Sequence, residues 1–175
     1  MNKQNNKKGF TLIELLIYIT LAGMILTAAI NLEVNVSRGQ ARAQQNHELY
    51  INAQVAINQI DRKIREADDV ITASSTFGTN PGVLTLDYPG TGTDIIFNTY
   101  PKEIMRGGTP VTITKLRIKE GSADPIDLTS DNVDVTDFTL SNLTIGGNKN
   151  NIGIELTLER EDASFSIETA VSVRK

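Results

Sequence analysis

The first part of the chain is an apolar run that is long enough to cross a membrane. From Phe10 to Ile30 the side chains are apolar or small, and Glu14 is the one charged residue among them. The run has 21 residues, and a helix of that length rises about 30 Å, which matches the hydrocarbon core of a bilayer. We therefore predict one membrane-spanning helix here.

The next stretch, residues 31–67, predicts that the helix continues with one apolar face. It contains no proline and a single glycine, Gly39. Its second half has apolar residues at intervals of three and four, the spacing of an amphipathic helix. These residues are Leu49, Ala53, Ala56, Ile57, Ile60, Ile64 and Ala67. We expect a helix from Phe10 to about Ala67 whose second half lies on another part of the protein.

After Asp69 the pattern changes to short apolar runs of period two, separated by turn-rich segments. In residues 152–158, isoleucine and leucine alternate cleanly with glycine, glutamate and threonine. Residues 133–145 also alternate, but the phase shifts near Asp137 and again near Asn142, which predicts a bulge or a bend at each position. Several such strands predict an antiparallel sheet with one face covered by the helix.

These patterns together predict an α+β protein, in which a long N-terminal α-helix packs on an antiparallel β-sheet domain. We expect residues 1–9 to be a cytoplasmic leader and residues 10–30 to be the transmembrane helix. Residues 31–67 would continue that helix as an amphipathic segment. Residues 68–175 would form a β-rich domain outside the cytoplasm.

Composition narrows the class of function. The chain has 175 residues, one histidine, no cysteine and no tryptophan. Without cysteine, disulfides, thiol catalysis and cysteine metal sites are excluded. The chain has 17 basic and 21 acidic residues, a formal net charge of −4. We expect no nucleic-acid partner, because phosphate binding needs clustered lysine and arginine.

The placement of the charges predicts the orientation in the membrane. Lys3, Lys7 and Lys8 precede the apolar run, and the first nine residues contain no acid. Lysines beside an apolar run resist translocation, so we expect the N-terminus in the cytoplasm and the acidic body outside. Arg38 and Arg42, on the other side of the run, weaken this bias.

The residues alone leave three interpretations of the opening segment. It is a plain membrane anchor, a secretory signal cleaved at Thr27-Ala28-Ala29, or a segment in which Glu14 has a purpose. A charged residue at the centre of a membrane helix costs roughly 2.5–3.5 kcal/mol, and it is therefore a functional hypothesis by default. The alternative is a glutamate that reaches the membrane interface and has no role.

The residues KKGFTLIELL, Lys7 to Leu16, resemble the prepilin leader of type IV pilins and type II secretion pseudopilins. The resemblance implies that a membrane peptidase cuts between Gly9 and Phe10 and methylates the new amino group of Phe10. It implies that Lys7 and Lys8 stay in the cytoplasm. It also implies that Glu14 pairs with the amino group of Phe10 on a neighbouring subunit, which would offset the cost of the carboxylate.

The resemblance also implies a pilin-like fold and a structural subunit rather than an enzyme, without metal or cofactor. The expected partners are the prepilin peptidase and methyltransferase, other pilin or pseudopilin subunits, an inner-membrane assembly platform and membrane lipid. The protein would cross the bacterial cytoplasmic membrane once. Its N-terminal helix would assemble it into an extracytoplasmic filament.

Two other stretches are similar to minor members of this family. Gln54 to Val70 is similar to the region after the anchor in J-like minor pseudopilins, and Ser166 to Lys175 to the C-terminal strand of minor prepilin-type proteins. Major pilins of the family typically close a C-terminal loop with a disulfide, which this chain cannot form. The resemblance favours a minor pilin or pseudopilin, or a major one from a lineage without that disulfide.

Other candidate chemistry in the sequence is weak. His47 has no nucleophile motif to accompany it. A cluster of acidic residues offers the oxygen ligands that calcium prefers, but its spacing fits no EF-hand, and a solvated acidic edge is the alternative. This cluster contains Asp127, Asp131, Asp134 and Asp137. We therefore expect no catalytic residue and no metal site.

Two further features have both an ordinary and a functional interpretation. Lys115, Arg117 and Lys119 share a strand face by their spacing, as a DNA-binding patch would, but no aromatic residues are interleaved with them. Gly23 lies inside the apolar run, where it allows close packing of another helix or a local loosening of its own helix.

Two other classes of protein stay open as alternatives. One is a membrane-anchored surface β-domain that binds a ligand and does not polymerise. The other is a secreted hydrolase released after Ala29. The N-terminal residue of the mature protein separates them, because it would be methylated Phe10 in a prepilin, Met1 in the binding protein and Ile30 in the hydrolase.

Overall fold

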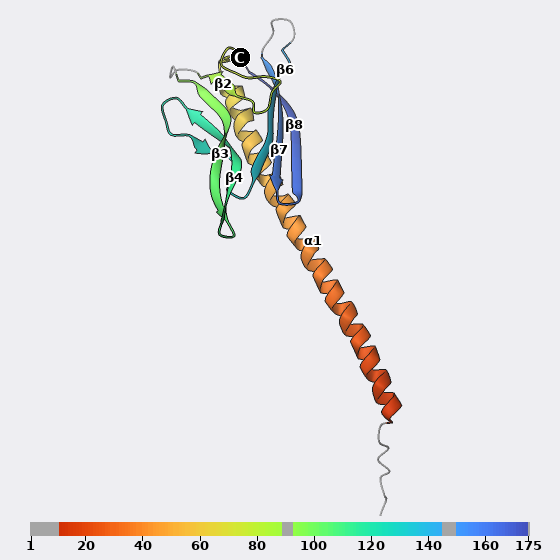
Figure 1. Cartoon of the computed structure of the whole chain (residues 1–175). Coiled ribbons are helices and arrows are strands. Elements are labelled where there is room, and N and C mark those ends of the chain that lie inside the picture. The colour runs from red at the N-terminus through yellow and green to blue at the C-terminus, as the bar shows by residue number, and fades with distance from the viewer. Residues whose placement is uncertain (1–10, 89–92, 145–149, 175) are drawn as a thin grey trace, which may run out of the picture. The chain divides into compact units, whose positions relative to one another are not determined.

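The computed structural model describes residues 11–88, 93–144 and 150–174. The chain divides into two compact units, Met1–Ala43 and Gln44–Lys175, which we describe separately. One long helix, α1 (Leu12–Glu66), has residues in both units, and all strands belong to the second unit (Figure 1).

In the first unit, the described residues form only helix. Residues 12–43 are helical, and all of residues 11–43 are exposed. The most apolar 18-residue window of α1 has a mean hydropathy of 2.1, and none of it is buried. By length and composition, α1 can therefore cross a membrane. It continues without a break through Gly23, so the described chain has no local loosening at that residue.

The second unit contains two antiparallel sheets. The first has five strands in the order β1-β2-β3-β4-β5, and the second has three in the order β6-β7-β8. The first sheet is made of β1 (Asp69–Val70), β2 (Leu84–Asp87), β3 (Ile95–Arg106), β4 (Thr109–Glu120) and β5 (Ile126–Asp127). The second is made of β6 (Asp134–Asn142), β7 (Asn151–Arg160) and β8 (Ala163–Ser172).

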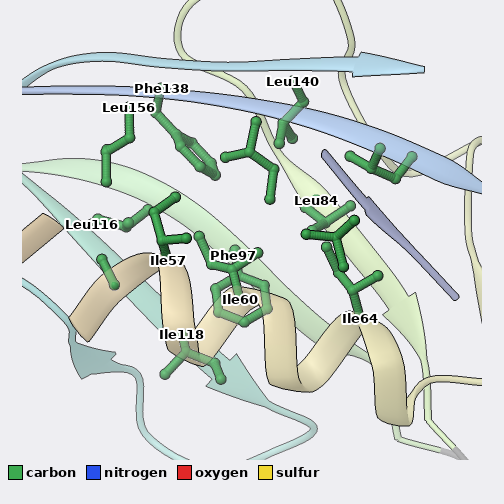
Figure 2. Close-up of a cluster of buried hydrophobic side chains, with 14 of the residues drawn as sticks. Ile57, Ile60, Ile64, Leu84, Phe97, Leu116, Ile118, Phe138, Leu140 and Leu156 are labelled. Carbon is green, nitrogen blue, oxygen red and sulfur yellow. The ribbon is translucent and has the colours of Figure 1, made fainter. Parts of the chain in front are cut away.

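The expected α+β class, a long N-terminal helix against antiparallel strands, is confirmed, but the strands form two sheets where we expected one. Each sheet turns an apolar face toward the same helix, so the helix is covered from two sides. Figure 2 shows Ile57 and Ile60 of α1 between side chains of the first sheet, such as Leu116, and of the second, such as Phe138. Two sheets bury more of a single helix than one sheet can.

The helical face predicted from the sequence is the one that the structure buries. All seven of its apolar residues are less than 9% exposed. The clean alternation in β7 is confirmed in the same way, since Ile152, Ile154, Leu156 and Leu158 are buried. Periodicity alone was therefore sufficient to find the buried side chains of this helix face and of β7.

The two phase shifts predicted in residues 133–145 have different causes. The pairing of β6 with β7 shifts register between Val135 and Asp137, which confirms the bulge there. Near Asn142, β6 ends instead, and the Asn142 side-chain oxygen accepts a hydrogen bond from the backbone N–H of Thr144 at 3.0 Å. Because a bend and a strand end both interrupt a period of two, the sequence did not distinguish them.

Candidate functional site

Glu14 lies in the first turn of α1. Thr11 precedes the helix, and its hydroxyl oxygen accepts a hydrogen bond from the backbone N–H of Glu14 at 3.3 Å. The Thr11 carbonyl accepts another from the N–H of Leu15 at 3.2 Å. Thr11 is therefore the N-cap of the helix, and Glu14 is its third residue. A carboxylate at this position is stabilised by the positive end of the helix dipole.

The sequence already contains the signal for this local contribution, which we did not predict. Thr11 followed by Glu14 three residues later is the pattern of a capping box, in which both side chains serve the start of a helix. Glu14 therefore has a local reason to be there in addition to any contact with another chain. It is also exposed, so that another chain can reach it.

The other residues predicted at this end lie outside the described residues. They are Lys7, Lys8, Gly9 and Phe10. Cleavage between Gly9 and Phe10, methylation of Phe10 and the pairing of its amino group with Glu14 stay predictions.

The aliphatic side chains of the first unit are widely exposed in the described chain. Leu12 is 77% exposed, Met24 72% and Ile25 70%. Apolar surface on this scale must be covered by lipid or by other helices. Two threonines of the run satisfy their hydroxyl groups within the helix, so they can face lipid as well as another helix. The Thr20 hydroxyl donates to the Leu16 carbonyl at 3.0 Å, and the Thr27 hydroxyl donates to the Gly23 carbonyl at 2.8 Å.

One side of this helix is slightly hollowed by small residues. The hollow is lined by Thr20, Gly23, Met24, Thr27, Ala28 and Asn31. A methyl group added at Gly23 would meet nothing within 4 Å in the described chain. Small residues on a membrane helix allow a second helix to approach closely. Gly23 therefore leaves space on the helix surface without interrupting the helix.

The first unit thus combines an exposed apolar helix with a glutamate in its first turn. The family model described as the prokaryotic N-terminal methylation motif matches residues 4–30. Residues 4–30 therefore carry a prepilin-type N-terminus, which is typical of type IV pilins and pseudopilins. The match covers residues 4–9 of the expected leader and the apolar run of residues 10–30 in this prepilin-type chain. No curated protein and no solved structure matches the chain.

The second unit of the prepilin-type chain contains a cluster of paired charges on the first sheet. One oxygen of Asp131 lies 2.9 Å from the amino groups of both Lys102 and Lys115, and Asp127 lies 3.3 Å from that of Lys102. Lys115 is 1% exposed and also donates to the Thr129 carbonyl. Hydrogen bonds from Lys102 and Lys115 lower the pKa of Asp131, and the bond to Asp131 helps to raise the pKa of Lys102.

The acidic residues that could offer oxygen ligands to calcium have other partners in the fold. Asp127 and Asp131 face lysines, and Asp134 accepts a hydrogen bond from the backbone N–H of Thr114 at 2.7 Å. In residues 11–88, 93–144 and 150–174, no group of three or more histidine, cysteine or acidic side chains is placed to hold a metal ion. Asp127, Asp131 and Asp134 thus have partners within the fold.

Two of the three basic residues of β4, Lys115 and Arg117, are also engaged within the fold. Lys115 and Arg117 do lie on one face of the strand, as their spacing predicts, but Lys115 is buried. The Arg117 guanidinium lies 4.5 Å from the centroid of the Tyr100 ring and donates to the side chain of Asn98 at 2.9 Å. These two side chains are not free to bind phosphate groups.

Glu48 of α1 connects the helix to β7 and to the segment that joins the two sheets. One of its oxygens accepts hydrogen bonds from the Ser130 hydroxyl at 3.4 Å and from the Asn132 amide at 3.2 Å, and the other pairs with Arg160. Asn52, one turn later, accepts from the backbone N–H of Ser130 at 2.8 Å. Ser130 and Asn132 lie in the segment that joins the two sheets, and Arg160 ends β7. These contacts hold that segment against the helix.

Proposed function

We propose that this protein is a structural subunit of a type IV pilus or a type II secretion pseudopilus. The observation that carries the proposal is the methylation motif over residues 4–30, joined to an exposed apolar helix with Glu14 in its first turn. A minor pilin or a J-like minor pseudopilin is the form favoured by the sequence. In this role the protein is a substrate of the prepilin peptidase, not an enzyme.

In this proposal, assembly depends on the amino group of Phe10 and the carboxylate of Glu14. Cleavage after Gly9 leaves a free amino group on Phe10, just before α1 begins. The Glu14 carboxylate of one subunit accepts a hydrogen bond from this ammonium group of the next subunit. Each charge would be costly alone in the membrane, and the pair neutralises both. The same pair fixes the axial offset between neighbouring helices. On assembly, the apolar side chains near this pair move from contact with lipid to contact with other helices.

The proposal includes a location and partners. Before assembly the subunit crosses the bacterial cytoplasmic membrane once, with Lys7 and Lys8 in the cytoplasm. It meets the prepilin peptidase and methyltransferase, an inner-membrane assembly platform and other pilin or pseudopilin subunits. The second unit then lies on the outer side of the membrane, in the filament.

The mass of the mature protein tests the processing step. Intact protein purified from native membranes is expected to begin at N-methylated Phe10. A mass that corresponds to an intact Met1 would favour the non-polymerising membrane-anchored binding protein. A mass that begins at Ile30 would favour a secreted hydrolase, and either result would contradict the proposal.

Assembly is tested by replacing Glu14 with glutamine. Glutamine preserves the capping pattern with Thr11 but removes the charge. We expect Glu14→Gln to insert and be cleaved, and its incorporation into filaments to fall about tenfold or more, because a charged hydrogen bond is worth roughly 1.5–3 kcal/mol. Filaments are quantified by shearing and immunoblotting.

Glu33→Gln is the matched control, because Glu33 is an exposed glutamate of the same helix. It is expected to assemble normally. Wild-type filament yield from Glu14→Gln would show that Glu14 serves only the start of its own helix.

A further inference from the structure

The edges of the two sheets are protected to very different extents. In the described part of the chain, the outermost strands of the two sheets are β1, β5, β6 and β8. Beyond Phe97, β3 also has no described strand on its outer side. However, Pro101, Lys102 and Arg106 interrupt that edge. Strands β1 and β5 have two residues each, which leaves little backbone for another chain to pair with. An exposed long edge is a template for strand pairing, and most proteins cover or interrupt it.

The outer edge of β6 is covered by the loop that precedes β2. The Phe138 carbonyl accepts from the N–H of Gly82 at 2.7 Å, and the Leu140 carbonyl accepts from the N–H of Gly78 at 2.8 Å. The Asn80 side chain accepts a hydrogen bond from the N–H of Phe138 at 3.2 Å and donates one to the Thr136 carbonyl at 2.9 Å. The outward backbone groups of β6 are therefore satisfied inside the molecule.

Strand β8 has no such protection within the described residues. It pairs with β7 over ten residues without a register shift, and it lies at the right-hand margin of the domain in Figure 1. Its sequence, ASFSIETAVS, contains no proline, lysine or arginine. Every second residue of an edge strand directs its N–H and C=O away from the sheet. In the described part of the chain, the outer edge of β8 is thus long, uninterrupted by a bulge and unpaired.

The outward face beside this edge is acidic. Glu168 of β8 lies directly opposite Glu155 of β7, and both are exposed. Two like charges in a cross-strand pair destabilise a sheet. Glu159 of β7 is a third exposed glutamate on this face. A cation placed next to Glu168 would relieve the repulsion.

The inward face beside the edge is apolar and only partly covered. Phe165 and Ile167 of β8 are half-buried and pack against the core. The Tyr50 ring of α1 lies edge-on to Phe165, with 5.6 Å between centroids, and Tyr50 is 45% exposed. An additional strand beside β8 would place its inward side chains over this apolar surface.

We propose that the edge of β8 binds an extended segment of a different protein, in which apolar side chains alternate with lysine or arginine. The backbone pairs antiparallel or parallel with β8. The apolar side chains cover Phe165, Ile167 and Tyr50, and the basic ones face Glu168 and Glu155. This is strand addition to a sheet edge, in which the main chain gives affinity and alternate side chains give specificity.

The charges select this partner over a second copy of the same strand. Two β8 strands paired so that their Glu168 residues are opposite each other would repel, and the strand itself, Ala163–Ser172, contains no cation. The proposal is independent of the role of the N-terminal helix in filament assembly.

The test uses the full-length protein in nanodiscs of zwitterionic lipid and a fluorescent ten-residue peptide that alternates valine and lysine. We expect saturable binding by fluorescence anisotropy, and slower hydrogen exchange in residues 163–172 when the peptide is bound. A peptide with glutamate in place of lysine, a peptide interrupted by two prolines, and empty nanodiscs are the controls. None of these is expected to give specific binding.

Two matched variants locate the peptide on the protein. Glu168→Lys should weaken binding about tenfold, because a favourable cross-strand pair becomes a repulsive one. Glu103→Lys makes the same change of net charge at an exposed position of β3 and should leave binding unchanged. Circular dichroism checks that both variants are folded.

Several outcomes would overturn the proposal. They are no binding of the lysine peptide, equal binding of the proline-interrupted peptide, and equal binding by Glu168→Lys. Protection of residues 163–172 in a dimer without peptide would also overturn it, because the occupant of the edge would then be a second copy. None of these results bears on filament assembly, which the Glu14 variants test separately.

Discussion

At the scale of single residues, Glu14 and Lys115 are charged side chains that are each stabilised by a nearby group. Glu14 is in the first turn of a helix, where the dipole favours it, and Lys115 is buried beside Asp131. The sequence pointed to Glu14 as a candidate but did not indicate that Lys115 is buried, because a lysine in an alternating strand is normally exposed. Only the three-dimensional position of Asp131, sixteen residues later, explains it.

The Asp131 cluster predicts a dependence of stability on pH. Because its bonds to Lys102 and Lys115 lower the pKa of Asp131, the carboxylate stabilises the folded state at pH values above its ordinary pKa of about 4. That contribution is lost as the pH falls through the lowered pKa. We expect the melting temperature to fall less between pH 7 and pH 3 in Asp131→Asn than in wild type.

Asp124→Asn is the control for this measurement, because Asp124 is exposed in the turn before β5. Its melting temperature should follow that of wild type. Parallel pH curves for wild type and Asp131→Asn would contradict the assigned role of Asp131.

At the scale of elements, the hydrophobic period predicted α1 and the clearest strands because burial on one face imposes that period. It did not predict how far β3 extends. Ile95–Phe97 was recognised, but β3 continues to Arg106 by pairing with β4, through residues that are mostly half-exposed or exposed. A strand without a buried face has no alternation to detect. For the same reason the sequence did not reveal which edges are covered.

The buried face of α1 can be tested with one truncation. Ile60 is fully buried between the sheets, so Ile60→Ala should lower the free energy of unfolding of the second unit by about 2–5 kcal/mol. Val55 is 48% exposed on the same helix, and Val55→Ala should change it by less than about 0.5 kcal/mol. Chemical denaturation followed by circular dichroism measures both, and equal effects would contradict the helix orientation.

The cover over β6 depends on a residue without a side chain. A Cβ at Gly82 would lie 2.9 Å from the Phe138 carbonyl oxygen, to which Gly82 itself is bound. We expect Gly82→Ala to destabilise the second unit by about 1–3 kcal/mol through overpacking. Thr79→Ala, at an exposed position of the same loop, should be close to neutral in the same denaturation experiment. A stable Gly82→Ala protein with unchanged exchange in β6 would contradict this contact.

At the scale of the whole molecule, the two units are stabilised by different means. The second unit buries its own core, whereas the described part of the first unit is an apolar helix that must find its partners outside the chain. The sequence shows a change from an unbroken apolar run to periodic patterns. It did not predict two sheets, because strand order depends on contacts between residues far apart in the chain. The family resemblance concerned the first unit most directly.

The first unit is expected to hold the protein in the membrane. After expression in bacteria, full-length protein should stay in the membrane pellet after washing with carbonate at high pH. A Leu21→Arg variant should be released in a larger fraction, because a charge near the centre of a membrane helix costs roughly 2.5–3.5 kcal/mol. Val36→Arg, beyond the apolar run, should stay in the pellet, and equal release of both variants would contradict a membrane span.

The contacts of Glu48 have a mechanical consequence. This one carboxylate binds the segment between the sheets as well as the end of β7, while Asn52 holds the same segment one turn later. A pulling force applied along α1 therefore reaches β7 and the segment between the sheets at the same place, which couples the two sheets under load. Stretched in a single-molecule experiment, the second unit should rupture in one step, and Glu48→Ala should divide that rupture into two smaller ones.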